Sequence, residues 1–257
     1  MSTRREELSV GEHPSIAIKN LSGLVEVRSG EHDRVVVTIE ADDADEWVVT
    51  QLHDSISVHP DDRRRRRVRR ARVVVELPSG SDVEIRSASA DVVLIGAFGS
   101  TKIRTMSGDV RAGAVTRLDV DTASGAARAD AVASTAACNT ASGDVEMGEV
   151  GGPLTIGTAS GNVRVALAAD DVEIGTASGD VRIGRFDGSS LTVKCISGDV
   201  SVGLPSGIRV EPDISTLAGR TSLPTPSITR IAGERRVVRV GLRTVSGDIT
   251  LERVDAN

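Results

Sequence analysis

Acidic residues recur at one position of a short motif, so a row of carboxylates is the first candidate for chemistry. The third position of this Ser-Gly-Asp motif is occupied by Asp109, Asp144, Asp180, Asp199 and Asp248, with Ala126 and Asn162 in two further copies. Stacked carboxylates would offer oxygen ligands to Ca²⁺, and two of them could form the acid pair of a glycosidase. The alternative is a turn, because Ser and Asp side chains bond nearby backbone N–H groups.

We favour the turn for two reasons. The nine-residue, glycine-rich calcium repeat is absent, and a catalytic pair is expected at one place instead of in every copy. The sequence therefore predicts no catalytic residue, no cofactor and no metal site. It assigns a structural role in turns to Ser107, Gly108, Asp109, Ser142, Gly143, Asp144, Ser178, Gly179, Asp180, Ser197, Gly198 and Asp199.

An arginine-rich run is the best single candidate for binding a partner. It contains Arg63, Arg64, Arg65, Arg66, Arg67, Arg69, Arg70 and Arg72. Such a run can bind nucleic acid, anionic lipid or an acidic protein. The alternative is a solvated loop balanced by acidic neighbours. We favour the loop, because no aromatic residues are interleaved for base stacking and the net charge of the chain is −6.

The remaining reactive residues show no pattern typical of a site. Cys138 and Cys195 are the only cysteines, and stacking of their repeats would place them roughly 14 Å apart, beyond disulfide reach. We expect them to be small core residues in a reducing compartment. The histidines show no metal-ligand spacing, and the chain has no phosphate loop, dinucleotide fingerprint or nucleophile elbow. These histidines are His13, His32, His53 and His59.

A repeat determines the elements that must position these residues. The motif serines are separated by 17, 18, 18, 18 and 19 residues, and they are Ser107, Ser124, Ser142, Ser160, Ser178 and Ser197. A degenerate copy begins at Ser89, Leu217–Arg220 resembles a decayed copy, and Val245–Asp248 is a clean final one. Asn20–Val27 is an outlying first copy.

Apolar and polar residues alternate on both sides of the motif, which is typical of strands flanking a turn. Apolar residues lie four before the serine, as at Ile156 and Ile174, and three after it, as at Val145, Val163 and Val181. The corner is ambiguous, because a threonine two before the serine and an apolar residue directly before it compete for the inward position. The apolar residues are Ala123, Ala141, Ala159, Ala177 and Ile196.

Stacking these units in parallel would bury like residues on like residues about 4.8 Å apart. The sequence therefore predicts an all-β fold, a parallel β-solenoid of about 18-residue coils, expected to be right-handed. An antiparallel sandwich has no need for such a period. One Trp, two Phe and no Tyr also indicate a narrow core.

The two ends of the repeat array differ from its middle. Residues 1–80 contain longer apolar alternations and are expected to form an N-terminal β-strand cap, since solenoid ends need shielding. Residues 81–257 are expected to form the solenoid, closed by an irregular C-terminal segment that contains Pro224 and Pro226.

The order of these segments resembles a known family. The stretch IAIKNLSGLVEV, then charged strands, then ELPSGSDVEIRS and repeated TASGDV units is similar to the bacterial putative-adhesin family of β-strand-repeat proteins, a domain of unknown function. The likeness covers roughly residues 14–253. The resemblance implies a β-solenoid with an adhesive or scaffolding role.

We expect a non-enzymatic structural, scaffolding or adhesin-like module, able to self-assemble, whose partner is another protein or a second copy. One alternative is a tether to an anionic surface or nucleic acid through Arg63–Arg72, and another is a polysaccharide-active β-helix enzyme. The N-terminus has no apolar signal-peptide core, and no 18-residue apolar run occurs. The sequence therefore predicts no membrane span and a cytoplasmic location.

Overall fold

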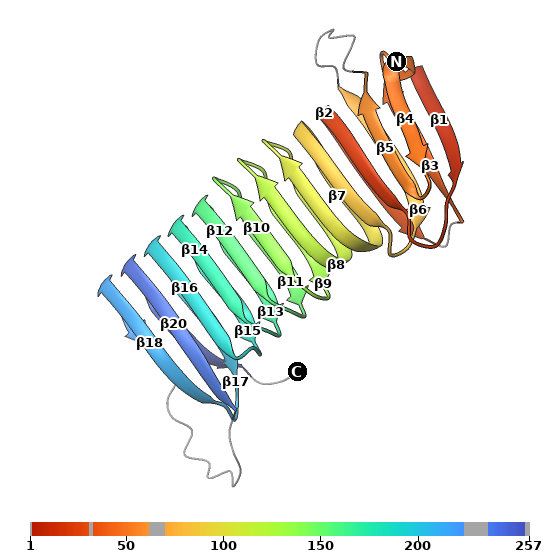
Figure 1. Cartoon of the computed structure of the whole chain (residues 1–257). Helices are drawn as coiled ribbons and strands as arrows, with labels where there is room; N and C mark the ends of the chain where they lie inside the picture. Colours follow the sequence, from red (N-terminus) through yellow and green to blue (C-terminus); the bar gives the residue numbers. More distant parts are fainter. Residues whose placement is uncertain (1, 31–32, 62–69, 224–235, 255–257) are drawn as a thin grey trace. The chain divides into compact units, whose positions relative to one another are not determined.

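The computed structural model describes residues 2–30, 33–61, 70–223 and 236–254. Within these ranges nearly all of the chain is β-strand, and the single helical element is a short 3₁₀ turn, η1 (Ala44–Glu46). None of the described helical structure is long and apolar enough to cross a membrane. The chain divides into two compact units, Met1–Ala131 and Val132–Asn257, which we describe separately (Figure 1).

The second unit is a regular stack of two-stranded coils. Its strands are β10 (Ala136–Thr140), β11 (Val145–Val150), β12 (Leu154–Ser160), β13 (Val163–Ala168), β14 (Val172–Ser178), β15 (Val181–Phe186), β16 (Ser190–Ser197), β17 (Val200–Pro205), β18 (Arg209–Ala218), β19 (Thr221–Ser222), β20 (Val237–Ser246) and β21 (Ile249–Val254). Each strand pairs in parallel with its equivalent in the next coil, so Val145 lies beside Val163 and Val163 beside Val181. The predicted β-solenoid is therefore confirmed, while its handedness stays a prediction.

The last coils are not stacked in chain order. β20 pairs with β16 on one side and with β18 on the other, and β21 lies likewise between β17 and β19. In chain order the terminal coil, β18 and β19, comes first, and residues 237–254 then return to lie between it and the coil of β16 and β17. Both C-terminal copies of the motif are real rungs, because Ala218 lies beside Ser246.

The first unit combines parallel coils with an antiparallel layer. Its strands are β1 (Ser2–Ser9), β2 (Ser15–Gly30), β3 (Arg34–Ala41), β4 (Trp47–Leu52), β5 (Ser55–Pro60), β6 (Ala71–Pro78), β7 (Asp82–Thr105), β8 (Val110–Thr122) and β9, which ends at Val132 (Ala127–Val132). The long strand β2 pairs in parallel with β7 on one side and with β5 and β6 on the other. Beyond them β3 and β1 continue antiparallel from β6, and β4 continues antiparallel from β5.

The antiparallel pairs β1–β3, β3–β6 and β4–β5 thus lie within residues 2–78. The division into compact units falls after Ala131, within the repeat array, whereas the sequence predicts a boundary between cap and solenoid after residue 80. The compact units and the predicted domains divide the chain by different criteria, and the predicted boundary stays a prediction.

The corner of each coil turns the threonine inward and the apolar residue outward. Thr105, Thr122 and Thr140 are buried, and the Oγ1 of each accepts a hydrogen bond from the turn glycine three residues later, at 2.9–3.1 Å. At these three corners the hydroxyl gives the glycine N–H an acceptor, which an alanine or isoleucine at that position could not provide. The neighbouring apolar side chain is left exposed, as at Ile196.

The turn glycines are required because successive coils approach closely there. Gly179 has φ +131°, and a Cβ on it would lie 2.3 Å from the carbonyl oxygen of Gly161. Gly198 has φ +144° and would meet the carbonyl of Gly179 in the same way. A positive φ and a backbone contact this short both exclude a side chain.

We predict that Gly179→Ala destabilises the fold by about 2–4 kcal/mol, since it combines backbone strain with a clash against a carbonyl. The matched control is Gly175→Ala in β14, the strand just before this turn, where a Cβ would meet nothing within 4 Å. That change should be neutral or stabilise by about 0.5 kcal/mol. Urea unfolding curves measure both, and equal effects would contradict the close stacking of the turns.

Candidate functional site

The motif aspartates link successive coils through their side chains. In the second unit the Oδ1 of one residue accepts a hydrogen bond from the backbone N–H of its equivalent on the adjacent rung, at 2.8–3.0 Å. The acceptor and donor pairs are Asp144 and Asn162, Asn162 and Asp180, Asp180 and Asp199, Asp199 and Asp248, and Asp248 and Arg220. In the first unit Asp91 accepts from Asp109 and Asp109 from Ala126, both at 3.0 Å.

This ladder explains why Asn162 fits into a column of aspartates. An amide oxygen accepts the same hydrogen bond as a carboxylate oxygen, so what the position requires is an acceptor. The predicted turn residues Ser107–Asp109, Ser142–Asp144, Ser178–Asp180 and Ser197–Asp199 all lie where one strand passes into the next. Among the described residues, no three Asp, Glu, His or Cys side chains gather closely enough to hold a metal ion.

Only part of the arginine run falls in the described chain. Arg63, Arg64, Arg65, Arg66, Arg67 and Arg69 lie outside the described residues. Arg70 is an exposed residue directly before β6. The guanidinium of Arg72 lies 3.1 Å from a carboxylate oxygen of Glu26 and 3.7 Å from one of Glu40, so it already has internal counter-charges.

Glu26 is the buried centre of this ion-pair cluster. Its carboxylate accepts hydrogen bonds from Arg28 at 2.7 Å and from Arg72 at 3.1 Å. Burial alone would raise the pKa of this carboxyl, but the hydrogen bonds and charges of the two arginines outweigh it, and the pKa is lowered from 4.5. The charged form of Glu26 is therefore favoured by folding.

The two cysteines are buried core residues that form no disulfide, as predicted. Cys138 lies beside Ile156, and Cys195 lies beside Thr176 three rungs further along the stack. Burial raises the pKa of the Cys195 thiol, although a hydrogen bond with Thr244 acts in the opposite direction. A buried thiol held in its neutral form is a weak nucleophile.

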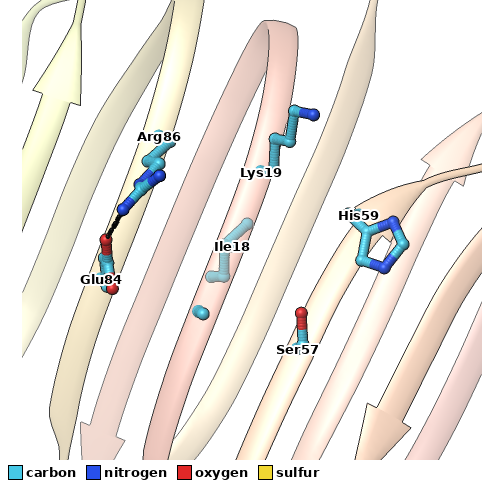
Figure 2. A pocket seen from close by; sticks show the side chains of 7 residues that line it. Ile18, Lys19, Ser57, His59, Glu84 and Arg86 are labelled. Carbon is cyan, nitrogen blue, oxygen red and sulfur yellow. Dashed lines mark hydrogen bonds and ion pairs between the residues drawn. The ribbon is translucent and has the colours of Figure 1, made fainter. Parts of the chain in front are cut away.

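A hollow of about 360 Å³ lies on the outer surface of β5, β2 and β7. Figure 2 shows Lys19 on the central strand, with His59 and Ser57 on one side of it and Arg86 and Glu84 on the other. The register explains the hollow, because Ala17 lies between Ser57 and Glu84 on the neighbouring strands. The small alanine side chain forms the floor, and the longer residues stand around it.

The upper rim of this hollow is basic. Lys19 and Arg86 are direct neighbours in the parallel register of β2 and β7, and His59 also lines the hollow from β5. Arg86 binds Glu84 Oε1 through Nε at 2.9 Å and through Nη2 at 2.7 Å, and a guanidinium has five N–H donors in all. The hollow can therefore present several cationic donors to one ligand.

Sequence reasoning missed this hollow, since His59 was considered only as a metal ligand. A usable signal was nevertheless present. The segments SISVH, SIAIK and DVEIR share the same alternation, and alignment of their buried residues places His59, Lys19 and Arg86 on one outward row. The alternation alone does not predict that β2 pairs with both β5 and β7.

An exposed apolar column lies on the second unit. Ile196, Val245 and Leu217 occupy the outward corner position of three adjacent rungs, because Ser197 pairs with Ser246 and Ser246 with Ala218. Their exposed fractions are 58%, 46% and 82%. Large apolar side chains that follow one another on adjacent rungs and are open to water are typical of interaction surfaces.

We predict that Asp180→Ala lowers the free energy of unfolding by about 1 kcal/mol, since it leaves the N–H of Asp199 without its acceptor. Asp180→Asn should keep the stability within about 0.5 kcal/mol, because the amide oxygen replaces the carboxylate oxygen. Thermal unfolding with and without Ca²⁺ measures both variants. A loss of stability in Asp180→Asn, or stabilisation of the native chain by Ca²⁺, would show that the charge matters and would favour a cation site.

We predict that Glu26→Gln destabilises the chain by roughly 1–3 kcal/mol at pH 7. Because the folded-state pKa of Glu26 is lowered, this contribution is present above the unfolded pKa and disappears as the pH falls through the folded pKa. The difference in free energy of unfolding between this variant and the native chain should therefore shrink below about pH 4. Glu84→Gln is the control, since its pair with Arg86 is more exposed and contributes little. A difference independent of pH would contradict this role of Glu26.

Comparison with known proteins places the chain in a family. Among curated proteins, none matches it. Similar solved structures include a putative adhesin from Parabacteroides merdae, with 12% identity, a TM-score of 0.46 and coverage of 98% of this chain and 96% of the other. Another is a putative lipid binding protein from Parabacteroides distasonis, with 13% identity, a TM-score of 0.48 and the same coverages. The model of the Toastrack DUF4097 family matches residues 13–252, and the chain therefore belongs to that family.

Proposed function

We propose that this chain is a non-enzymatic structural module that associates with a second copy of itself. The observation that carries the proposal is the apolar column of Ile196, Val245 and Leu217. In the described chain the motif aspartates bond adjacent coils to one another, and three of the motif threonines bond the glycines of their own turns, so these repeated polar groups serve the scaffold. What the scaffold offers to a partner is its outer surface.

The column is a surface that a second copy fits well. Its members are branched or long apolar side chains on neighbouring rungs, and strand spacing sets them about 4.8 Å apart. A twofold axis through the column would bring the same row onto itself, as in most soluble homodimers. Each side chain would then leave water against another apolar side chain.

The charges beside the column favour this contact as well. Lys194 lies 3.9 Å from Glu173, and Arg243 lies 2.8 Å from Asp213. Each cation bordering the column thus has an acidic neighbour within its own chain. Two identical surfaces can approach without the repulsion that an unbalanced charge would cause.

Strand addition at the terminal coil is a less favourable route to association. The N–H of Arg209 donates toward β20, so alternation directs the backbone groups of Val210, Pro212 and Ile214 to the outer edge of β18. Pro212 has no N–H to give there. Proline and charged residues are common devices against pairing at an edge strand. We therefore assign the contact to the outward column.

The other hypotheses from the sequence stay predictions. The tether to an anionic surface or nucleic acid depends mainly on arginines outside the described residues. A polysaccharide-active enzyme gains no supporting observation here. We propose the cytoplasmic location because the two buried cysteines form no disulfide, which suits a reducing compartment.

We predict that the native chain forms a dimer in sedimentation-velocity experiments over a concentration series. The triple variant Ile196→Ser, Leu217→Ser, Val245→Thr should weaken association by about 100-fold, because burial of each apolar side chain contributes about 1 kcal/mol or more. Leu52→Ser is the matched control, since Leu52 is 72% exposed on β4 and lies outside the column. A chain that stays monomeric at all concentrations, or a triple variant that still dimerises, would overturn the proposal.

A further inference from the structure

We propose that the hollow over Ala17 on the first unit is a binding site for a phosphate group. It shares no residue with the apolar column, so it is a second surface with a different chemistry. The lining residues come from three neighbouring parallel strands, β5, β2 and β7. Such a site lies on rigid elements, which hold binding groups more precisely than loops do.

The pattern of charge on this face first indicates an anion. Elsewhere on the outer face of β7, cations lie beside acids on the next rung, with Lys102 3.4 Å from Asp119 and Arg104 3.3 Å from Asp121. At the hollow the register instead places a cation beside a cation, Lys19 beside Arg86. Two cationic side chains on neighbouring strands can both donate to the oxygens of one anion.

The donors around the hollow suit a tetrahedral oxyanion. Lys19 provides an ammonium, Arg86 a guanidinium, and Ser57 a hydroxyl from the opposite strand. Arginine and lysine are the usual phosphate binders, since their N–H groups form charge-assisted hydrogen bonds with its oxygens. A single phosphate can therefore contact three strands at once.

The floor of the hollow provides the room. Ala17 lies on the rung that carries Ser57 and Glu84, and Ile18 points into the core, where it is 2% exposed. A bulky residue at position 17 would fill the space between the strands. The volume of about 360 Å³ is enough for a phosphate and the first atoms attached to it.

Removal of the Glu84 charge distinguishes an anion site from a cation site by the direction in which the affinity changes. Its carboxylate binds Arg86 at 2.7 Å and lines the same hollow, so it competes with an incoming anion for that guanidinium. Removal of its charge should strengthen binding of phosphate. If the hollow instead served a cation, the same change would weaken binding.

The experiment is an NMR titration of the full chain with inorganic phosphate at constant ionic strength. We expect saturable shifts at the amides of Ala17, Lys19, Ser57 and Glu84. Lys19→Gln should reduce the affinity at least fivefold, and Glu84→Gln should raise it two- to fivefold. Lys102→Gln is the matched control on the same face, and it should leave the affinity unchanged. Preserved amide dispersion shows that each variant is folded.

Three results would overturn the site. They are the lack of saturable shifts up to about 20 mM phosphate, an equal loss of affinity in Lys19→Gln and Lys102→Gln, and weaker binding in Glu84→Gln. None of them depends on whether the chain dimerises. The two proposals therefore succeed or fail independently.

A second arm identifies where the phosphate comes from. Vesicles of phosphatidylcholine and phosphatidylglycerol at roughly 7:3 are compared with pure phosphatidylcholine by co-sedimentation. Binding to the anionic vesicles that is lost in Lys19→Gln assigns the site to a lipid headgroup. Phosphate shifts without vesicle binding assign it to a soluble phosphate compound. Vesicle binding that persists in Lys19→Gln, together with no phosphate shifts, would overturn the site.

Discussion

Parallel pairing of each coil with the next is the constraint on which the rest of the structure depends. In a parallel ladder with an 18-residue period, every side chain lies beside its own equivalent. A column of one residue type is therefore stable only if two such side chains can lie side by side at equivalent positions of adjacent coils. Valine, isoleucine and leucine satisfy this condition by packing, and they form the core columns, as at Val163, Val181 and Val200. Narrow columns of this kind leave little room for aromatic rings.

Polar residues satisfy the same condition by bonding to the backbone instead of to one another. Each motif aspartate reaches the N–H of the next one, so a column of like charges becomes a column of hydrogen bonds. Inward threonines such as Thr105, Thr122 and Thr140 bond the turn glycines, and the glycines allow the backbones of neighbouring turns to come close together. The motif thus combines three solutions to one stacking problem, which is why it recurs as a unit.

The same constraint explains how much of the molecule could be predicted. The period and the alternation identify the solenoid and its core columns, because stacking repeats them in every coil. The inward threonine could not be chosen from the pattern, since the choice depends on a hydrogen bond to Gly143 and its equivalents. The inserted position of β20 could not be found either, because both C-terminal copies of the motif have lost the 18-residue spacing. The internal pairing of Arg72 with Glu26 needed the register of β2 and β6.

Both proposed surfaces lie where the repeat is broken, and this follows from the constraint as well. In the regular coils the outward positions that precede the motif serine carry small residues such as Gly157, Ala159, Gly175 and Ala177, which offer little to a ligand. The hollow forms where β2 pairs with β5, a strand outside the periodic array. The apolar column forms where β20 is inserted beside β18. A regular solenoid can only repeat one surface along its length, so a distinct binding surface requires a rung that departs from the pattern.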